Sequence, residues 1–424
     1  MIDYKDIIHI DLEASSLCNA ECPSCSRRAS GGIKNSTFTE TFMTLQNIKD
    51  WFSVDFIKQL HMITMCGNYG DAMTNPDLIP ILQYFKSINS EIFFHMNTNA
   101  SGRDTQFWLD LGEIFKEKGV LVFSVDGLED TNWIYRRGTH WDKIIHAMTN
   151  YISTGAQARW EFLVFRHNQH QIEEAKELSK EMGFKQFHAK KAMGFVNVIN
   201  ETGSIEHNMR VYGNEGQFEY TIKPPINTET KNINSRQDNR SLGKDPQQNT
   251  TEETPNLESG YLKDINLQLE KSVVPLQPIK WYNNQDINID PTRELSEHEK
   301  QLGECDIDCE AMANKKIFVN SYGLVFPCCY TSAIYDDEFG GGDMVVPLRT
   351  FINTYGKENI SLKHNSLKDV IDGDIYTSGW IESFKDRDIR NKRLKACSIF
   401  CGKEKKREDL TATQDSLAKE KSLI

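Results

Sequence analysis

Three cysteines stand close together near the start of the chain. Cys18, Cys22 and Cys25 have the spacing C-x3-C-x2-C within the run Leu-Cys-Asn-Ala-Glu-Cys-Pro-Ser-Cys. Thiolates hold iron–sulfur clusters, and a cubane cluster usually takes four of them. A loop with three thiolates would leave one iron open to bind another molecule. The spacing therefore predicts a reactive cluster, with a zinc knuckle or three unrelated core thiols as the alternatives.

A second group of cysteines lies near the end of the chain, at positions 305, 309, 328, 329, 397 and 401. Two strand-like runs flank Tyr322-Gly323, which predicts a hairpin that returns Cys328 toward the start of this unit. Cys397 and Cys401 then form a C-x3-C pair. A zinc site of four thiolates is the alternative to a second cluster. Cys66 lies outside both groups in the sequence and is interpreted as a core thiol.

The segments that must position these cysteines alternate in type from about residue 5 to about residue 192. Short β-branched or aromatic runs predict strands at 7–12, 61–66, 92–97, 120–125, 160–166 and 185–190. Amphipathic runs predict helices at 44–60, 77–87, 105–118, 141–154 and 171–182. This order is typical of βα units around a parallel sheet, whose catalytic loops follow the strands. The first cysteine group follows the first strand.

The cysteine loop resembles the signature of the radical S-adenosylmethionine (radical SAM) enzymes. In that family the open iron is chelated by the amino and carboxylate groups of SAM. Reductive cleavage then gives methionine and a 5′-deoxyadenosyl radical that takes a hydrogen atom from the substrate. The resemblance implies that Cys18, Cys22 and Cys25 are catalytic and hold a 4Fe-4S cluster. It also implies an α/β fold, an open partial (β/α)6 TIM-like barrel followed by a small cysteine-rich α+β domain.

The spacing from Cys309 through Gly323 to Cys328 resembles the opening of the SPASM and twitch domains, which hold auxiliary 4Fe-4S clusters. The full SPASM pattern of later cysteines is absent, and six cysteines cannot fill two four-thiolate clusters. One probable auxiliary cluster is therefore expected, with Cys309, Cys328, Cys397 and Cys401 as its leading ligands. Cys305 and Cys329 are spares, either of which could replace a member.

Several polar residues after the strands resemble the parts of the family that contact SAM. Gly70-Asp71-Ala72 stands where the family has Gly-Glu-Pro, so that match is partial. Asn99 follows the third predicted strand, Ser124 and Asp126 lie at the end of the fourth, and Asn168 follows the fifth. Arg136 and Arg137 suit the SAM carboxylate because a guanidinium can bond both oxygens, and which of them does so stays open. The expected cofactor-binding residues are Gly70, Asp71, Asn99, Ser124, Asp126, Arg136, Arg137 and Asn168.

The composition sets the remaining limits. The 424 residues carry a formal charge of −12, which argues against general binding to nucleic acid. There is no apolar run long enough for a membrane span and no basic, apolar start typical of a signal peptide, so a cytoplasmic protein is expected. The expected units are the barrel at 1–195, a polar and partly disordered insertion or linker at 196–302, the cluster domain at 303–402 and a charged tail at 403–424.

The resemblance implies an oxidoreductase or maturase supplied by a flavodoxin- or ferredoxin-like reductant. SPASM enzymes commonly modify peptides or proteins, so a peptide substrate leads. A small molecule, such as a sugar, an amino acid or a cofactor precursor, is the close alternative. A non-catalytic zinc or electron-transfer protein is the alternative from another class.

Overall fold

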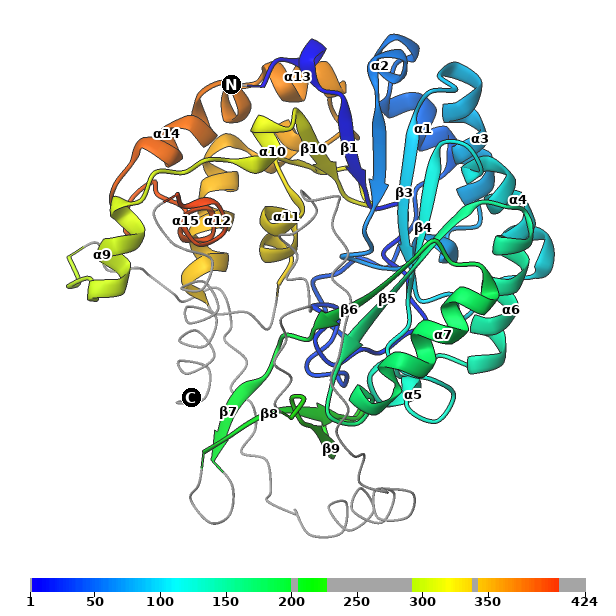
Figure 1. Cartoon of the computed structure of the whole chain (residues 1–424). Coiled ribbons are helices and arrows are strands. Elements are labelled where there is room, and N and C mark those ends of the chain that lie inside the picture. The colour runs from blue at the N-terminus through cyan, green and yellow to red at the C-terminus, as the bar shows by residue number, and fades with distance from the viewer. Residues whose placement is uncertain (1, 200–204, 227–291, 338–341, 404–424) are drawn as a thin grey trace.

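The computed structural model describes residues 2–199, 205–226, 292–337 and 342–403 (Figure 1). Most of the predicted polar insertion and nearly all of the charged tail lie outside these residues. Within the described part of the chain, no helix is long and apolar enough to cross a membrane.

One eight-stranded sheet organises the molecule, with the strand order β11-β10-β1-β2-β3-β4-β5-β6. The six strands of the predicted barrel run parallel, and β10 adds a further parallel strand beside β1. Their bounds are β1 (His9–Leu12), β2 (Met62–Met65), β3 (Phe93–Thr98), β4 (Gly119–Ser124), β5 (Gln157–Val164) and β6 (Gln186–Lys191). The open (β/α)6 barrel predicted from the sequence is confirmed.

Helices cover the outer, convex face of this curved sheet (Figure 1). They are α1 (Leu45–Trp51), α2 (Val54–Gln59), α3 (Leu78–Ile88), α4 (Thr105–Phe115), α6 (Trp141–Ser153) and α7 (Ile172–Met182). Each strand sends its apolar side chains toward them, so that Ile10, Ile63 and Phe94 are fully buried. This burial of apolar surface supplies the main driving force for forming the barrel.

The alternate residues of the strands face the concave side, and many of them are polar. His9 Nε2 on β1 bonds Thr64 Oγ1 on β2 at 2.7 Å. His95 on β3 is close enough to interact electrostatically with Arg159 on β5 and Asp11 on β1. Side chains from the first, third and fifth strands can meet in this way only if they share the concave face. The concave face of the sheet therefore carries polar side chains rather than an apolar core.

The segment predicted as one helix at 44–60 is two helices, α1 and α2. Phe52 ends α1 in an extended conformation, and Ser53 caps α2 by accepting a hydrogen bond from Phe56 N at 3.2 Å. A serine at this position competes for the backbone N–H groups that a continuous helix would use. The break lets Trp51, Phe52 and Phe56 all turn into the core, where they are buried.

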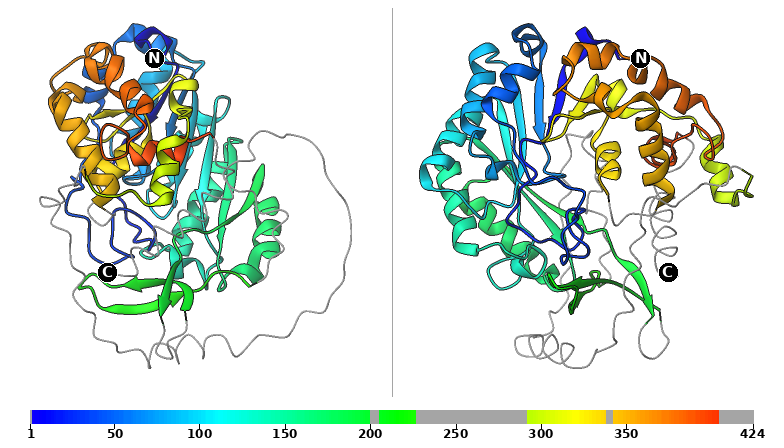
Figure 2. Two further views of the ribbon diagram at one scale, coloured as in Figure 1. Left: turned by 90° about the vertical axis from the view of Figure 1, so that its left-hand side faces the viewer. Right: turned by 180° about the vertical axis from the view of Figure 1, so that it is seen from behind.

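Three strands within residues 196–199 and 205–222 form an antiparallel sheet that was not predicted from the sequence. Its strands are β7 (Val196–Ile199), β8 (Ile205–Tyr212) and β9 (Phe218–Ile222). Met209, Val211 and Ile222 are buried in a small apolar cluster. This cluster also contains Ala20 and Cys22 of the first cysteine loop. Tyr220 Oη also bonds Ile134 O at 2.7 Å. The sheet therefore covers the cysteine loop (Figure 2).

The C-terminal segment begins at α9 (Glu297–Glu304) and α10 (Glu310–Ala313) and continues into the hairpin of β10 (Lys316–Val319) and β11 (Val325–Phe326). The predicted hairpin is confirmed, and Gly323 in its turn has φ +87°, which favours glycine. After it come α11 (Cys329–Tyr335), α12 (Gly342–Tyr355), α13 (Leu367–Asp372), α14 (Trp380–Lys385) and α15 (Lys395–Cys401). These helices lie across the open side of the barrel from α1–α7 (Figure 1).

Candidate metal centres

The first cysteine loop leaves the C-terminal end of β1 and lies within the curve of the sheet (Figure 2). Cys25 N donates to Cys22 O at 3.1 Å, which closes a tight turn between these two residues. The Cys18 thiol is within electrostatic range of Cys22, and Cys22 of Cys25. The loop thus gathers the three predicted thiols at the mouth of the barrel, as their spacing required.

Hydrogen-bond donors surround two of the three sulfurs. Cys18 Sγ accepts from Ala20 N at 3.4 Å and from Asn99 Nδ2 at 3.6 Å. Cys22 Sγ accepts from Arg136 Nη1 at 3.8 Å. Burial raises the pKa of Cys18 to about 12 and that of Cys22 to about 11, so the thiols hold their protons in the chain alone. A bound metal cluster would replace those protons, and the N–H donors would stabilise the resulting thiolates.

The predicted residue Asp71 holds the loop after β2 to its neighbours. Its carboxylate accepts from Asn99 N at 2.7 Å, Thr98 Oγ1 at 3.1 Å and Met73 N at 3.1 Å. Burial raises the pKa of Asp71 against these hydrogen bonds. The carboxylate is thus occupied by the chain itself, which fixes the ends of β2 and β3 against each other.

Gly70 lies against the backbone of the cysteine loop. A Cβ atom here would stand 2.4 Å from Leu17 O and 2.5 Å from Ser15 O, which are both backbone atoms that cannot swing away. Asp71 N also donates to Leu17 O at 2.8 Å. The predicted Gly70 and Asp71 thus bring the loop after β2 into direct contact with the segment that carries Cys18.

We expect Gly70→Ala to displace the cysteine loop, because the added methyl group overlaps two carbonyl oxygens. Overpacking of this kind destabilises a protein by about 1–3 kcal/mol. The melting temperature should fall, and less iron should bind on reconstitution. Gly102→Ala is the matched control, since its Cβ would meet only the flexible end of Met73 at 3.4 Å. Equal melting temperatures for the two variants would contradict this account.

Arg136 and Asp126 form a buried ion pair beside Cys22. Arg136 Nε lies 2.6 Å from Asp126 Oδ2, and the Asp126 side chain is fully buried. Asp126 Oδ1 also accepts from Leu163 N at 2.6 Å. One edge of the Arg136 guanidinium therefore faces the Asp126 carboxylate, and another faces the Cys22 sulfur. Ser124, also predicted to bind the cofactor, ends β4 two residues before Asp126 and is partly exposed.

Two other predicted cofactor-binding residues bond the chain's own groups. Arg137 Nη2 pairs with Glu219 on β9 at 2.7 Å, and its Nη1 donates to Tyr212 O at 2.7 Å. Asn168 is fully buried and donates to Asp126 O at 2.8 Å and Leu163 O at 2.9 Å. These contacts join β9 and the ends of β4 and β5 to the site. That either residue contacts SAM stays a prediction.

Glu13 is a buried carboxyl that the sequence reading did not single out. Its carboxylate accepts hydrogen bonds from Asn68 N at 2.7 Å and Tyr69 N at 3.2 Å, and so holds the loop after β2 in place. Burial raises the pKa of Glu13 to about 8. Glu13 continues the polar alternation of His9 and Asp11 one residue past the end of β1, and this pattern could have indicated it.

The raised pKa of Glu13 makes folding stability fall as the pH rises. Between an ordinary carboxyl pKa near 4.5 and about 8, the folded chain keeps a proton that the unfolded chain releases. The free energy of unfolding should therefore drop by at most about 1.4 kcal/mol per pH unit in this window. Urea unfolding measures this for wild type and Glu13→Gln from pH 5 to 8. The free energy of unfolding of the wild type, minus that of Glu13→Gln, should fall as the pH rises. The exposed Glu91→Gln should show no such trend, and a constant difference for Glu13→Gln would contradict the assignment.

The second cysteine group separates into four thiols and two others. Cys401 donates a hydrogen bond to Cys309, which lowers the pKa of Cys309 to about 7 and raises that of Cys401. Cys397 is within electrostatic range of Cys328 and Cys309. These are the four residues predicted as the leading ligand set, and α10, the β10–β11 hairpin and α15 bring them together. Their role as ligands stays a prediction.

A buried tyrosine fits a bound group among the four thiols. The Tyr376 hydroxyl is buried and has no hydrogen-bond partner within the described residues, and it lies in electrostatic range of Cys328 and Cys309. A buried hydroxyl without a partner is unfavourable, so a group that occupies the space among the thiols would satisfy it. Across the described ranges, no three His, Cys, Asp or Glu side chains are arranged around a single metal ion.

The two spare cysteines have other partners. Cys305 is 2% exposed, and its sulfur accepts from Arg393 Nη2 at 3.2 Å and lies 3.3 Å from Leu302 O. Cys329 faces Cys66, which donates a hydrogen bond to it. Cys66 was expected to be an isolated core thiol, and the structure instead places it in a pair.

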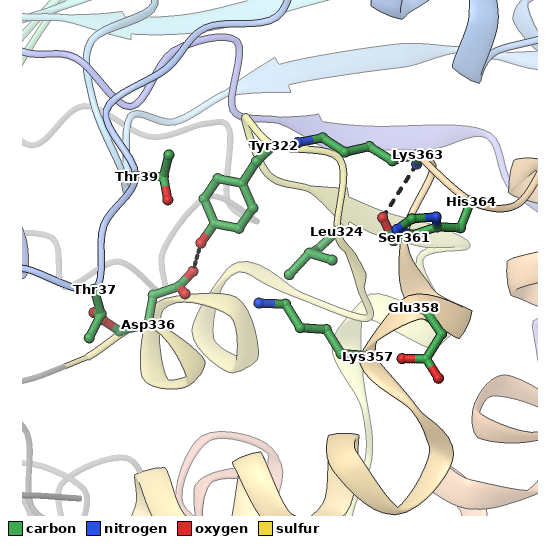
Figure 3. Close-up of a pocket in the computed structure, with 10 residues that line it drawn as sticks. All are labelled: Thr37, Thr39, Tyr322, Leu324, Asp336, Lys357, Glu358, Ser361, Lys363 and His364. Carbon is green, nitrogen blue, oxygen red and sulfur yellow. Dashed lines mark hydrogen bonds between the residues drawn. The ribbon is translucent and has the colours of Figure 1, made fainter.

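A pocket of about 420 Å³ lies between the cysteine loop and the C-terminal segment (Figure 3). Thr37 and Thr39 lie on the same side of the pocket as Asp336, which accepts a hydrogen bond from the Tyr322 hydroxyl. Lys357, an exposed residue, borders it. None of the cysteines lines this pocket, so it is separate from both thiol groups.

Comparison with known proteins gives only distant structural similarity. No protein-family model and no curated protein matches the chain. SuiB of Streptococcus suis, in complex with S-adenosylmethionine, is 14% identical with a TM-score of 0.41 over 76% of this chain and 60% of SuiB. The chain thus spans about three fifths of the length of SuiB. Native anSMEcpe with bound AdoMet is 13% identical, with a TM-score of 0.44 over 98% of this chain and 97% of that one. Similarity at this level does not establish a family or an activity.

Proposed function

We propose that this chain is a radical SAM enzyme. The observation that carries the proposal is the gathering of Cys18, Cys22 and Cys25 on one loop at the mouth of an open parallel barrel. Three thiols suit a cluster with one open iron, because a cubane usually takes four. When bound, this cluster would supply the electron that cleaves SAM and so starts hydrogen abstraction from the substrate.

The chain's own residues would tune and position that centre. Asn99, Ala20 and Arg136 donate to the cysteine sulfurs, and such hydrogen bonds stabilise thiolates and adjust the reduction potential. Asp126 holds Arg136 in place. Asp71 and Gly70 keep the loop after β2 against the cysteine loop, and the sheet of β7–β9 excludes water from one side of it.

Cys309, Cys328, Cys397 and Cys401 would hold one auxiliary 4Fe-4S cluster, with the Tyr376 hydroxyl beside it. In the proposed reaction this second centre would accept an electron from the product radical or help position the substrate. A flavodoxin- or ferredoxin-like protein would supply the first electron.

The substrate that we propose is a peptide, with a polar small molecule as the alternative. The polar barrel interior supports a substrate that carries hydrogen-bonding groups. His95 Nδ1 and Asn97 Oδ1 on β3 are buried and without partners within the described residues. Glu161 and Lys190 form an ion pair across β5 and β6 at 2.5 Å. A polar group entering the barrel would satisfy the unpaired atoms of β3.

Anaerobic reconstitution with iron and sulfide tests the proposal. The full chain should bind about eight irons and, with SAM and dithionite, should produce 5′-deoxyadenosine and methionine. The absorption band of the clusters should bleach on reduction. Bound zinc in place of iron, with no 5′-deoxyadenosine, would identify a structural zinc protein instead. About eight irons with no cleavage would favour an electron-transfer protein.

A further inference from the structure

Cys66 and Cys329 meet apart from both predicted ligand sets. Cys66 directly follows β2, and Cys329 begins α11, so one thiol comes from the barrel and the other from the C-terminal segment. The Cys66 thiol donates a hydrogen bond to Cys329, and neither residue is in a disulfide. Both side chains are partly exposed. The contact therefore joins two distant parts of the sequence through a free dithiol.

Polar groups hold this pair in place. Asn68 Nδ2 donates to Cys66 Sγ at 3.1 Å, and Glu13 Oε1 lies 3.9 Å from the same sulfur. The Lys316 ammonium lies in electrostatic range of both thiols and is anchored by Asp11 Oδ2 at 2.9 Å. An apolar core would surround a merely structural cysteine, whereas these two lie among amide, carboxyl and ammonium groups.

The neighbouring Cys328 and Cys329 face different surroundings. Cys328 is the N-cap of α11 with φ −151°, and its electrostatic neighbours include Cys309 of the four-thiol group. Cys329 is the first helical residue and turns to Cys66, Asp11 and Lys316. Cys328 and Cys329 are adjacent in the sequence, but their thiols have different neighbours. Cys329 can therefore react without removing a member of the predicted cluster.

We propose that Cys66 and Cys329 form a redox-active dithiol site that exchanges with a small-molecule disulfide. One protein thiolate attacks the disulfide and releases a first small thiol, leaving a mixed disulfide. The other protein thiolate then attacks that bond, closes Cys66–Cys329 and releases a second small thiol. The two protons of the protein thiols pass to the two released thiols, so the protein loses two electrons and the disulfide gains them. The site does not depend on the proposed SAM chemistry.

Trapping the thiols across a redox series tests this site. The full chain, both metal-free and reconstituted, is equilibrated without oxygen in mixtures of reduced and oxidised glutathione. It is then quenched in acid, alkylated with N-ethylmaleimide and mapped by mass spectrometry without reduction. A crosslinked peptide that joins Cys66 to Cys329 should rise with the oxidised fraction, and reduced glutathione should reverse it. In both preparations the crosslink should include most of the chains at the oxidised end.

Variants separate this site from the cluster ligands. Cys66→Ser should remove the crosslink and leave Cys329 alkylated, whereas Cys305→Ser should leave the crosslink unchanged. Iron content should stay at the wild-type value in Cys329→Ser. Full alkylation of Cys66 and Cys329 at every ratio would overturn the proposal. So would a crosslink from Cys329 to any other cysteine, or loss of iron in a Cys329→Ser variant whose circular dichroism matches the wild type. Because the mapping is done on the wild type, a variant that fails to fold does not decide the outcome.

Discussion

Replacement of Cys22 by alanine is expected to abolish SAM cleavage by the reconstituted protein. Cys22 is the middle thiol of the loop, is 7% exposed and receives the hydrogen bond from Arg136. Loss of an outer-sphere partner already costs a metal site roughly 10- to 100-fold. Removal of a ligand from a set of three should therefore reduce 5′-deoxyadenosine formation by more than about 100-fold. Iron should fall from about eight to about four per chain.

Cys305→Ser is the control for this experiment, because Cys305 bonds Arg393 and Leu302 rather than the thiols of either group. It should keep both iron content and SAM cleavage close to the wild type. Circular dichroism and the melting temperature of the metal-free proteins would show whether Cys22→Ala still folds. A folded Cys22→Ala variant that cleaved SAM at the wild-type rate would exclude the proposed function.

Replacement of Cys397 by alanine is expected to remove the second centre alone. Cys397 lies on α15 with Cys328 and Cys309 as its electrostatic neighbours, well separated in the chain from the first loop. Iron should again fall to about four per chain, yet 5′-deoxyadenosine should still form under dithionite. Metal analysis and the cleavage assay on one preparation separate this pattern from that of Cys22→Ala.

The outcome of Cys397→Ala also decides the metal at the second centre. Unchanged iron together with the loss of one bound zinc would assign a zinc site to the four thiols. Unchanged iron and no zinc would show that Cys397 is not a ligand. Cys305→Ser is again the matched control, since it replaces a cysteine of the same segment outside the four-thiol group.

Local sequence patterns predicted most of the barrel. The six strands were each expected within a few residues of their observed bounds, because apolar alternation and the following helices are local signals. The hairpin around Gly323 was equally local, since a turn glycine stands between two apolar runs. The break at Ser53 was missed because the amphipathic pattern of 44–60 continues through it, and capping by one serine was enough to divide the helix.

The sequence did not predict contacts between residues that are far apart in the chain. Nothing in residues 316–319 indicates that they lie parallel to β1, since the pairing depends on the whole intervening chain. The contact between Cys66 and Cys329 has the same origin. The three strands of 196–222 had a usable local signal, because Asn208, Met209, Arg210 and Val211 alternate between polar and apolar types. The Asn- and Thr-rich composition that follows them obscured it.

The sequence predicted the thiols of the candidate site and fewer of the contacts around them. The resemblance to SPASM and twitch domains grouped Cys309, Cys328, Cys397 and Cys401, and the structure brings these four near one another. That Asp71 and Asn168 contact the cofactor stays a prediction, and the structure adds that their side chains bond the chain's own backbone. Only the structure reveals these bonds, because the partners come from other strands.

The pairing of β10 with β1 has a consequence for biosynthesis. Register joins His9 to Lys316 and Leu12 to Val319, so one edge of β1 remains unpaired until residues 316–319 have been made. Exposed edges recruit other strands, and non-local pairings form slowly. Nascent chains should therefore need protection by chaperones, and fragments that end before residue 316 should aggregate. Assembly of a cluster on the loop after β1 would then follow translation rather than accompany it.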